Sequence, residues 1–302
     1  MKKTVLLIVG PTAVGKTTIA IALAKHYNTE IISADSRQCY KELTIGVAKP
    51  SADELQQIPH HFINTHSVHD IVTAASYEEY ALQVTEQIFQ THSEIVMVGG
   101  TGLYIRAFCE GMDFIPAADE GLRFQLQETY QRLGIEWLQK EVQLNDPIFA
   151  AQGEMQNPQR MLRALEIVSS TKKSILSFRK GVKQLRNFSI QKIGLELPRE
   201  QLYQQINDRV DAMMMQGFFD EVKSLSPLKK LNALQTVGYK ELFAHLDGYC
   251  NLQQAVDKIK QNTRHYAKRQ LTWFKRDEDI KWFHPSGIEE MIRFISTKKK
   301  PE

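Results

Sequence analysis

The strongest constraint on the fold is an eight-residue segment near the amino terminus, Gly10-Pro11-Thr12-Ala13-Val14-Gly15-Lys16-Thr17. The apolar run Thr4–Val9 precedes it and is typical of a strand buried on both faces of a parallel sheet. Thr18–His26 follows it, with apolar residues at helical spacing. The segment therefore matches G-x-x-x-x-G-K-[ST] between a strand and a helix, which is the context that a phosphate-binding loop requires. This pattern predicts an α/β protein with a doubly wound parallel sheet.

The residue types of this segment suit an anion. Glycines let the backbone wrap a phosphate so that successive N–H groups point inward, and a helix that begins near Gly15 adds the positive end of its dipole. Lys16 supplies a cation, and the Thr17 hydroxyl is a candidate ligand for Mg²⁺. We therefore expect residues 10–17 to bind a diphosphate or polyphosphate, with Mg²⁺ as the cofactor.

The remaining pattern predicts two domains. The other expected strands are Glu30–Ala34, Glu94–Val98 and Ile193–Leu197. From about residue 116 to about 186 the pattern is helical without a convincing strand, which predicts an all-helical domain inserted into a P-loop NTPase-like core of residues 1–115 and 187–302. The last part of that core is expected to be helical over Arg199–Ser224, Thr236–His245, Leu252–Phe274 and Gly287–Ile295.

Charge is unevenly distributed along the chain. The formal net charge is only +3. Residues 156–192, however, hold nine basic residues and one acidic residue, and residues 258–276 hold seven basic residues and no acidic residue. Such segregation favours a polyanionic partner such as a nucleic acid. Two solvated helix faces are the alternative interpretation.

Composition argues against several classes of protein. The apolar run Val5–Val9 is far shorter than the roughly 20 residues of a membrane span, and Gly10 follows it at once, so a secretory signal is not expected. The three cysteines are odd in number and form no C-x-x-C pair. They exclude a disulfide framework and a zinc ribbon, and we expect a cytoplasmic protein.

Polar side chains follow two of the predicted strands. Asp35 comes directly after Glu30–Ala34, and Thr101 lies in a glycine-flanked turn after Glu94–Val98. Residues just past the carboxyl ends of parallel strands line the ligand crevice, so both should lie beside the phosphate loop. Asp35 could accept a proton from a nucleophile or cap the following segment. Thr101 could bond a leaving group or be an ordinary turn residue.

Two absences bear on the chemistry at this loop. The run Ile95–Val98 ends in Gly99-Gly100-Thr101 without the acidic residue that motors and switches use for Mg²⁺ and water. The chain also has no Asn-Lys-x-Asp motif for guanine. Both absences count against an NTPase engine, whereas a small-molecule kinase stays open.

Nine blocks of this sequence, in this order, resemble the tRNA dimethylallyltransferases, also called tRNA isopentenyltransferases. The blocks are GPTAVGKT, ISADSRQCY, IGVAKP, PHHFI, VGGTGLYIRA, NPQRMLRALE, RVDAMMMQGFFDEV, QTVGYKE and TRHYAKRQLTWFKR. They cover residues 4 to about 283. The resemblance implies transfer of a dimethylallyl group from dimethylallyl diphosphate to N6 of the adenosine on the 3′ side of the anticodon, in tRNAs that read codons beginning with U. It also implies a monomer.

The resemblance assigns roles to individual residues. It makes Asp35 the acceptor of the adenine N6 proton, places Thr101 against the reacting region, and puts Lys16 and Arg209 on the diphosphate. An adenine in a stacked anticodon loop is inaccessible, so it must be extruded into the crevice. The residues implied to contact the tRNA are Asp35, Ser36, Arg37, Gln38, Thr101, Arg123, Gln159, Arg160, Met161, Leu162, Arg163 and Gln235.

The residue pattern adds to these assignments in the two basic segments. Arg160 and Arg163 share one helix face, whereas Met161 and Leu162 are more simply explained as the core of that helix. In the second segment the candidate phosphate contacts are Arg264, Lys268 and Arg269. The aromatic residues between them are expected to be packed core, namely Tyr266, Trp273 and Phe274.

Some residues depart from the family pattern, and two other functions stay open. Glu42, Thr44 and Val47 replace residues typical of the family, but none of the departures removes Lys16 or Asp35. One alternative is an isopentenyltransferase acting on free adenine nucleotides, which would have little use for a basic inserted domain. The other is a P-loop nucleotide kinase, which predicts turnover of ATP.

Overall fold

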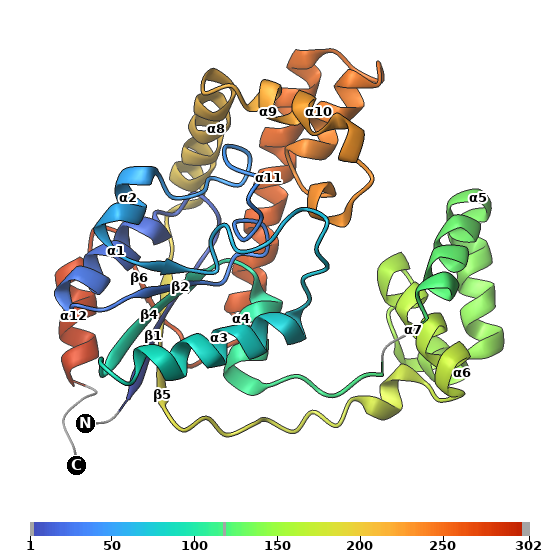
Figure 1. Cartoon of the computed structure of the whole chain (residues 1–302). Coiled ribbons are helices and arrows are strands. Elements are labelled where there is room, and N and C mark those ends of the chain that lie inside the picture. The colour runs from blue at the N-terminus through green and yellow to red at the C-terminus, as the bar shows by residue number, and fades with distance from the viewer. Residues whose placement is uncertain (1–2, 117–118, 298–302) are drawn as a thin grey trace. The chain divides into compact units, whose positions relative to one another are not determined.

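The computed structural model (Figure 1) describes residues 3–116 and 119–297. The chain divides into two compact units, one from residues 1–109 and 185–302 and the other from residues 110–184. The sequence placed the ends of the inserted segment at residues 116 and 186, a few residues further along the chain. Within the described ranges, no helix combines the length and the apolar character needed to span a membrane.

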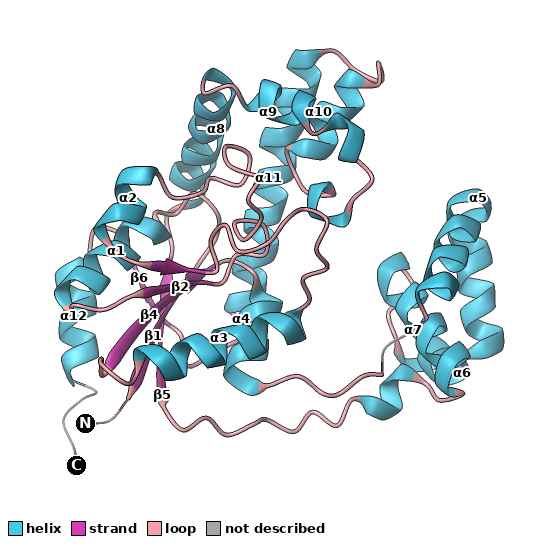
Figure 2. Ribbon diagram, viewed as in Figure 1, coloured by secondary structure: helices cyan, strands magenta, loops and turns pink. Residues whose placement is uncertain are grey.

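The first unit is built on one parallel sheet of six strands, ordered β3-β2-β4-β1-β5-β6. Figure 2 shows strands of this sheet in magenta among the cyan helices. In chain order the strands are β1 (Thr4–Val9), β2 (Ile31–Ser33), β3 (His60–His61), β4 (Glu94–Gly99), β5 (Ser189–Leu195) and β6 (Lys281–Phe283). Every strand pairs in parallel with its neighbours. The sheet and its helices confirm the predicted α/β class.

Alternate residues of β1 point to opposite faces of the sheet, because side chains along a strand have a period of two. Val5, Leu7 and Val9 pack in a cluster that includes α3 (Ala74–Ile88) and α4 (Gly102–Glu110). Leu6 and Ile8 pack in a second cluster with α1 (Lys16–His26), α8 (Arg199–Met215) and α12 (Ile288–Thr297). Helices thus cover both faces, and all six residues of β1 are buried. This burial is the reason for the uninterrupted apolar run.

Two strands lack a sequence signal. β3 and β6 are the two edge strands of the sheet and have only two and three residues. Both residues of β3 are partly buried histidines, so the strand contains no apolar run. The strand expected at Ile193–Leu197 is β5, which begins earlier, at Ser189, and ends at Leu195. The sequence did not indicate its first residues because they are polar or only partly buried.

The remaining helices of this unit also differ in detail from the prediction. The expected helix Arg199–Ser224 is two helices, α8 and α9 (Phe218–Ser224), because Gly217 between them has a φ of 93°. The expected helix Thr236–His245 is α10 (Tyr239–Leu246), and α11 (Leu252–Phe274) has the predicted bounds. α2 (Ala52–Gln57) is a short helix that was not predicted.

The described residues of the second unit form helices and connecting loops without a strand, as the sequence indicates. It contains α5 (Glu120–Asn145), α6 (Pro147–Gln152), α7 (Pro158–Thr171) and a 3₁₀ turn at Ile175–Phe178. Its own core includes Leu138, Val142, Phe149, Leu165 and Ile167.

Candidate active site

The phosphate loop, residues 10–17, joins β1 to α1. Gly10 and Gly15 both have positive φ values, 149° and 91°. A Cβ atom at Gly10 would also lie 2.6 Å from the backbone oxygen of Leu195 in β5. The loop can pass this close to the neighbouring strand only because residue 10 has no side chain.

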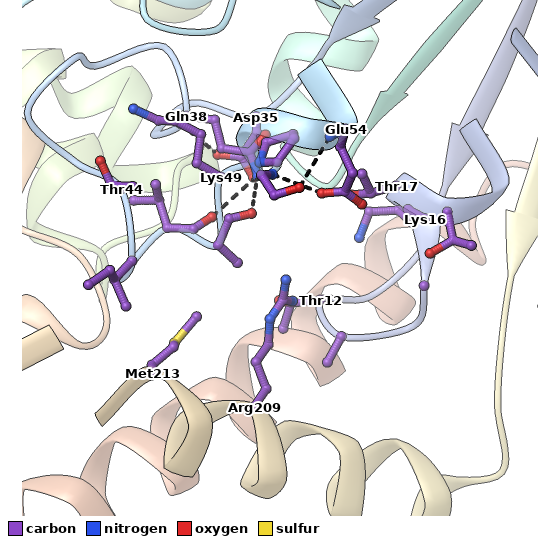
Figure 3. Close-up of a pocket in the computed structure, with 18 of the residues that line it drawn as sticks. Thr12, Lys16, Thr17, Asp35, Gln38, Thr44, Lys49, Glu54, Arg209 and Met213 are labelled. Carbon is purple, nitrogen blue, oxygen red and sulfur yellow. Dashed lines mark hydrogen bonds between the residues drawn. The ribbon is translucent and has the colours of Figure 1, made fainter. Parts of the chain in front are cut away.

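Three cationic side chains line one cavity beside this loop, namely Lys16, Lys49 and Arg209 (Figure 3). Lys49 donates to the backbone oxygen of Tyr40 at 2.7 Å. Lys16 donates from Nζ to the backbone oxygen of Pro11 at 2.7 Å. Arg209 reaches from α8, and its Nη1 lies 3.4 Å from Oγ1 of Thr12. Burial, and then the charge of Arg209, lower the pKa of Lys16 to about 7, against an opposing effect of Asp35. Burial likewise lowers the pKa of Arg209. Desolvated charges of one sign are stabilised by a bound anion.

Asp35 lies two residues after β2 and forms part of the same cavity. Its Oδ1 accepts the backbone N–H groups of Arg37 at 2.8 Å and Gln38 at 3.3 Å. The capping arrangement that the sequence left open is therefore present. These two bonds do not involve Oδ2, so capping does not use the whole carboxylate.

Thr101 connects the end of β4 to the end of β2. Its Oγ1 accepts the backbone N–H of Ser36 at 3.0 Å and lies 3.3 Å from the Ser36 hydroxyl. Its own backbone N–H donates to Ala34 at 3.2 Å. The two strand ends that the sequence predicted to face one crevice are thus hydrogen-bonded to each other beside Asp35.

Two cavities of the first unit meet at these side chains. The larger has a volume of about 680 Å³ and is lined by the phosphate loop, by residues 44–45, 47–52 and 54, and by α8. The smaller, of about 230 Å³, has a more apolar wall that includes Val210, Phe218 and Ile259. Six residues line both cavities: Thr12, Asp35, Val47, Ala48, Arg209 and Met213. The carboxylate of Asp35 and the guanidinium of Arg209 therefore lie where the two cavities adjoin.

A loop of residues 44–50 lines both cavities and is held by Glu221 of α9. The Glu221 carboxylate accepts the backbone N–H groups of Thr44 at 3.1 Å, Ile45 at 2.8 Å and Gly46 at 3.1 Å. It also accepts the hydroxyl of Tyr239 at 2.6 Å. A Cβ atom at Gly46 would lie 2.1 Å from the ring of Phe218, so this approach requires glycine.

The sequence analysis gave no role to Glu221 or to Gln270. Both side chains hold loops that line or adjoin the two cavities. Gln270 contacts Thr12 and Gly100, and Glu221 contacts Thr44 and its neighbours. Both glutamate and glutamine stand inside the blocks that carry the family resemblance. Nothing in their local spacing marks them, because the loop residues that they hold are more than 160 residues away in the chain.

The three residues of α11 that were predicted to contact phosphates differ in their exposure and in their hydrogen bonds. Arg264 donates to Asn207 Oδ1 at 2.7 Å, whereas Lys268 and Arg269 are exposed. Arg269 also lies 5.8 Å from the ring centre of Tyr266. Gln235, outside this helix, is exposed and donates to the backbone oxygen of Lys229.

The prediction that the aromatic residues of α11 are core is correct only for Phe274, which is 3% exposed. Trp273 is 37% exposed and lies against Gly102, where a Cβ atom would be 2.3 Å from its indole nitrogen. Tyr266 lines the smaller cavity. Residues on opposite sides of one helix have different neighbours, and composition alone does not separate them.

The second unit contains the other predicted tRNA contacts. Glu166 is 5% exposed and accepts from both Arg123, at 3.0 and 3.1 Å, and Arg163, at 2.9 Å. Arg160 is more exposed and pairs with Glu154, and Gln159 is exposed. The side chains of the two remaining predicted contacts are buried in the core of this unit, Met161 at 0% and Leu162 at 6% exposure. This burial agrees with the core interpretation rather than with an exposed RNA contact.

The first basic segment is divided between the two units. Residues 156–184 belong to the second unit, but Arg186 and Lys192 belong to the first. Arg186 pairs with Glu78 at 2.7 Å, and Lys192 in β5 pairs with Asp277 at 2.7 Å. Acidic partners therefore neutralise part of the positive charge that is concentrated along this stretch of the sequence.

The donor set suits Mg²⁺ held partly by a substrate. Within the described part of the chain, no group of three His, Cys, Asp or Glu side chains is arranged to hold a metal. Thr17 lines the larger cavity with Lys16. Mg²⁺ commonly keeps few protein ligands and takes the rest from phosphates and water, and the single hydroxyl of Thr17 fits that mode.

Comparison with known proteins gives consistent similarities. A family model described as IPP transferase matches residues 38–277. The chain is 47% identical over 292 residues to a tRNA dimethylallyltransferase of Christiangramia forsetii, covering 96% of this chain and 97% of that protein. It is 45% identical to tRNA dimethylallyltransferase 1 of Bacteroides thetaiotaomicron, covering 97% of this chain and 95% of the relative.

Solved structures show the same similarity. The crystal structure of a tRNA isopentenylpyrophosphate transferase from Bacillus halodurans has a TM-score of 0.73 and 36% identity, covering 98% of this chain and 97% of that one. A eukaryotic dimethylallyltransferase acting on tRNA has a TM-score of 0.77 and 25% identity, covering 98% of this chain and 77% of the other.

Proposed function

The chain belongs to the IPP transferase family of tRNA dimethylallyltransferases, and we propose that its two adjoining cavities hold the two substrates of that reaction. Dimethylallyl diphosphate would place its diphosphate in the larger cavity, against residues 10–17. The dimethylallyl group and the adenine that attacks it would meet at the smaller, more apolar cavity. The observation that carries this proposal is that Asp35 and Arg209 line both cavities.

The cations beside the phosphate loop would stabilise the leaving group. As the bond between carbon and the bridging oxygen breaks, negative charge grows on the diphosphate. Lys16 and Arg209 already lie at that cavity, and the planar guanidinium of Arg209 suits two phosphate oxygens. Mg²⁺, held by Thr17 and the diphosphate, would supply further positive charge there.

Asp35 would take the proton that the reaction releases. Adenine N6 forms the new bond to C1 of the dimethylallyl group, the bond from C1 to oxygen breaks, and the diphosphate leaves with the electron pair. The N6 proton passes to the Asp35 carboxylate, whose Oδ2 is not used in the bonds to Arg37 and Gln38. Thr101 and Ser36, bonded to each other beside it, would orient the base.

The acceptor would be the adenosine on the 3′ side of the anticodon, extruded from the loop, in tRNAs that read codons beginning with U. The exposed cations of α11 and of the second unit would contact the tRNA backbone. We also infer that the protein acts as a monomer in the cytoplasm, which the cysteine usage and the family resemblance support.

A labelled-substrate assay tests this proposal. Purified protein with Mg²⁺ and labelled dimethylallyl diphosphate is offered an unmodified tRNA, the same tRNA with guanosine in place of the target adenosine, or AMP. Label in the first tRNA alone is the expected result. Label in AMP but not in tRNA would instead show an enzyme of free nucleotides, and phosphoryl transfer from ATP would show a kinase.

A further inference from the structure

Gln270 of α11 is a buried side chain, 6% exposed, that connects two loops of the candidate active site. Its Oε1 accepts the backbone N–H of Thr12 at 2.8 Å, and its Nε2 donates to the backbone oxygen of Gly100 at 2.9 Å. A backbone N–H can only donate and a carbonyl can only accept. These two partners therefore determine the orientation of the amide.

The two loops are proposed to bind different substrates, one the diphosphate and the other the adenine. Thr12 stands in the phosphate loop, and its hydroxyl lies 3.4 Å from Nη1 of Arg209. Gly100 immediately precedes Thr101, whose hydroxyl accepts the Ser36 N–H beside Asp35. The Gln270 amide thus links the backbone of the phosphate loop, at Thr12, to the backbone next to Thr101, where the adenine is proposed to bind.

The position of Gly100 shows how closely the Gln270 amide approaches this loop. A Cβ atom there would lie only 2.2 Å from Nε2 of Gln270. The backbone of Gly100 does not have a positive φ, so its conformation does not require glycine. A side chain at residue 100 would therefore have to displace the Gln270 amide from its present position.

We propose that Gln270 is a positioning residue that holds the diphosphate loop at a constant distance from Thr101 and Asp35. The inference rests on the proposed function. Each substrate is bound largely by its own loop, whereas the distance between the reacting atoms depends on both loops. A displacement of about 1 Å can lower a rate by about 10²-fold. Loss of the link should therefore reduce kcat more than it changes either KM.

Two variants break the link from opposite sides. Gln270→Met has a similar length but forms neither hydrogen bond. Gly100→Ala leaves Gln270 intact and displaces its amide. Gln261→Met, at an exposed position of the same helix, is the matched control. Steady-state kinetics with dimethylallyl diphosphate and unmodified tRNA, corrected for the folded fraction measured by near-UV circular dichroism, gives kcat and both KM values.

We expect kcat to fall about 10- to 100-fold in the first two variants, with each KM within about threefold of the wild type, and no change in Gln261→Met. A wild-type kcat per folded molecule in Gln270→Met would overturn the inference. An increase confined to the KM for dimethylallyl diphosphate would also overturn it, because it would show a simple binding role. If Gln270→Met does not fold, Gly100→Ala decides by the same criteria. Wild-type protein without prenyl transfer would instead reject the proposed function.

Discussion

At the scale of single residues, Lys16 and Asp35 show how burial and hydrogen bonding prepare side chains for chemistry. The pKa of Lys16 is lowered to about 7, chiefly by burial, so the free protein loses much of this positive charge as the pH rises above that value. Asp35 is held by the backbone N–H groups of Arg37 and Gln38, which lie two and three residues further along the chain. Each of these features leads to a measurable consequence.

Pyrophosphate binding should be coupled to proton uptake by Lys16. A bound anion favours the protonated amine and raises its pKa above about 7, so between the two pKa values the complex holds more protons than the free protein. Affinity for pyrophosphate should then fall as the pH rises from 7 to 9. Titration calorimetry in two buffers of different ionisation enthalpy measures this uptake.

The control for that experiment is Lys16→Met, which has no titrating amine. Pyrophosphate itself also titrates in this range, so the uptake by Lys16 is the difference between the wild type and the variant. An equal proton uptake in both proteins would contradict the prediction.

Asp35→Asn separates the proton acceptor from the structural role of Asp35. The asparagine oxygen can still accept the N–H groups of Arg37 and Gln38, so the turn should be kept. We expect kcat to fall by about 10²- to 10⁴-fold with little change in tRNA affinity. Single-turnover rates and filter binding measure the two effects. A loss of tRNA affinity alone would show that the carboxylate is not the base.

At the scale of elements, the sequence predicted those strands and helices whose own residues show an apolar run or a helical period. β1 and α11 have the expected bounds, because a continuous apolar run and an amphipathic period are local properties. β3 and β6 are short edge strands that form only where a neighbouring strand supplies partners. The break between α8 and α9 depends on one positive φ, at Gly217.

Glu221 should control the order of the loop at residues 44–50. In Glu221→Gln the amide nitrogen would face backbone N–H groups, which cannot accept a hydrogen bond. Leaving such donors unsatisfied costs about 1–3 kcal/mol of stability. We expect faster hydrogen exchange at residues 44–46 and a higher KM for dimethylallyl diphosphate.

Asp220→Asn, one residue earlier in the same helix and exposed, is the control for this variant. Its exchange rates and KM should equal those of the wild type. Unchanged exchange at residues 44–46 in Glu221→Gln would show that the loop is held by other contacts.

At the scale of the whole molecule, the charge pattern is distributed over two units. Many of the basic residues pair with acidic side chains, as Arg163 and Arg123 do with Glu166. Positive potential available to RNA must come from the less firmly paired cations, such as Arg160, whose side chain is 56% exposed.

Arg160→Gln should reduce the salt dependence of tRNA binding without loss of stability. Removal of one phosphate contact lowers the slope of log K against log salt concentration by about 1. Its surface pair with Glu154 contributes little to folding, so the melting temperature should not change. Binding of an unmodified tRNA between low and high salt measures the slope. An unchanged slope would assign Arg160 to the solvated surface.

The amino-acid sequence by itself determined the phosphate loop, the buried central strand, the helical insertion and the family. Each of these depends on neighbouring residues or on motifs read in order. Tertiary structure alone decided that Asp35 and Arg209 stand between two cavities, that Glu221 holds the loop at residues 44–50, and that Gln270 links Thr12 to Gly100. The physical reason is distance along the chain: these contacts join segments more than 160 residues apart, which only the folded sheet and its covering helices bring together.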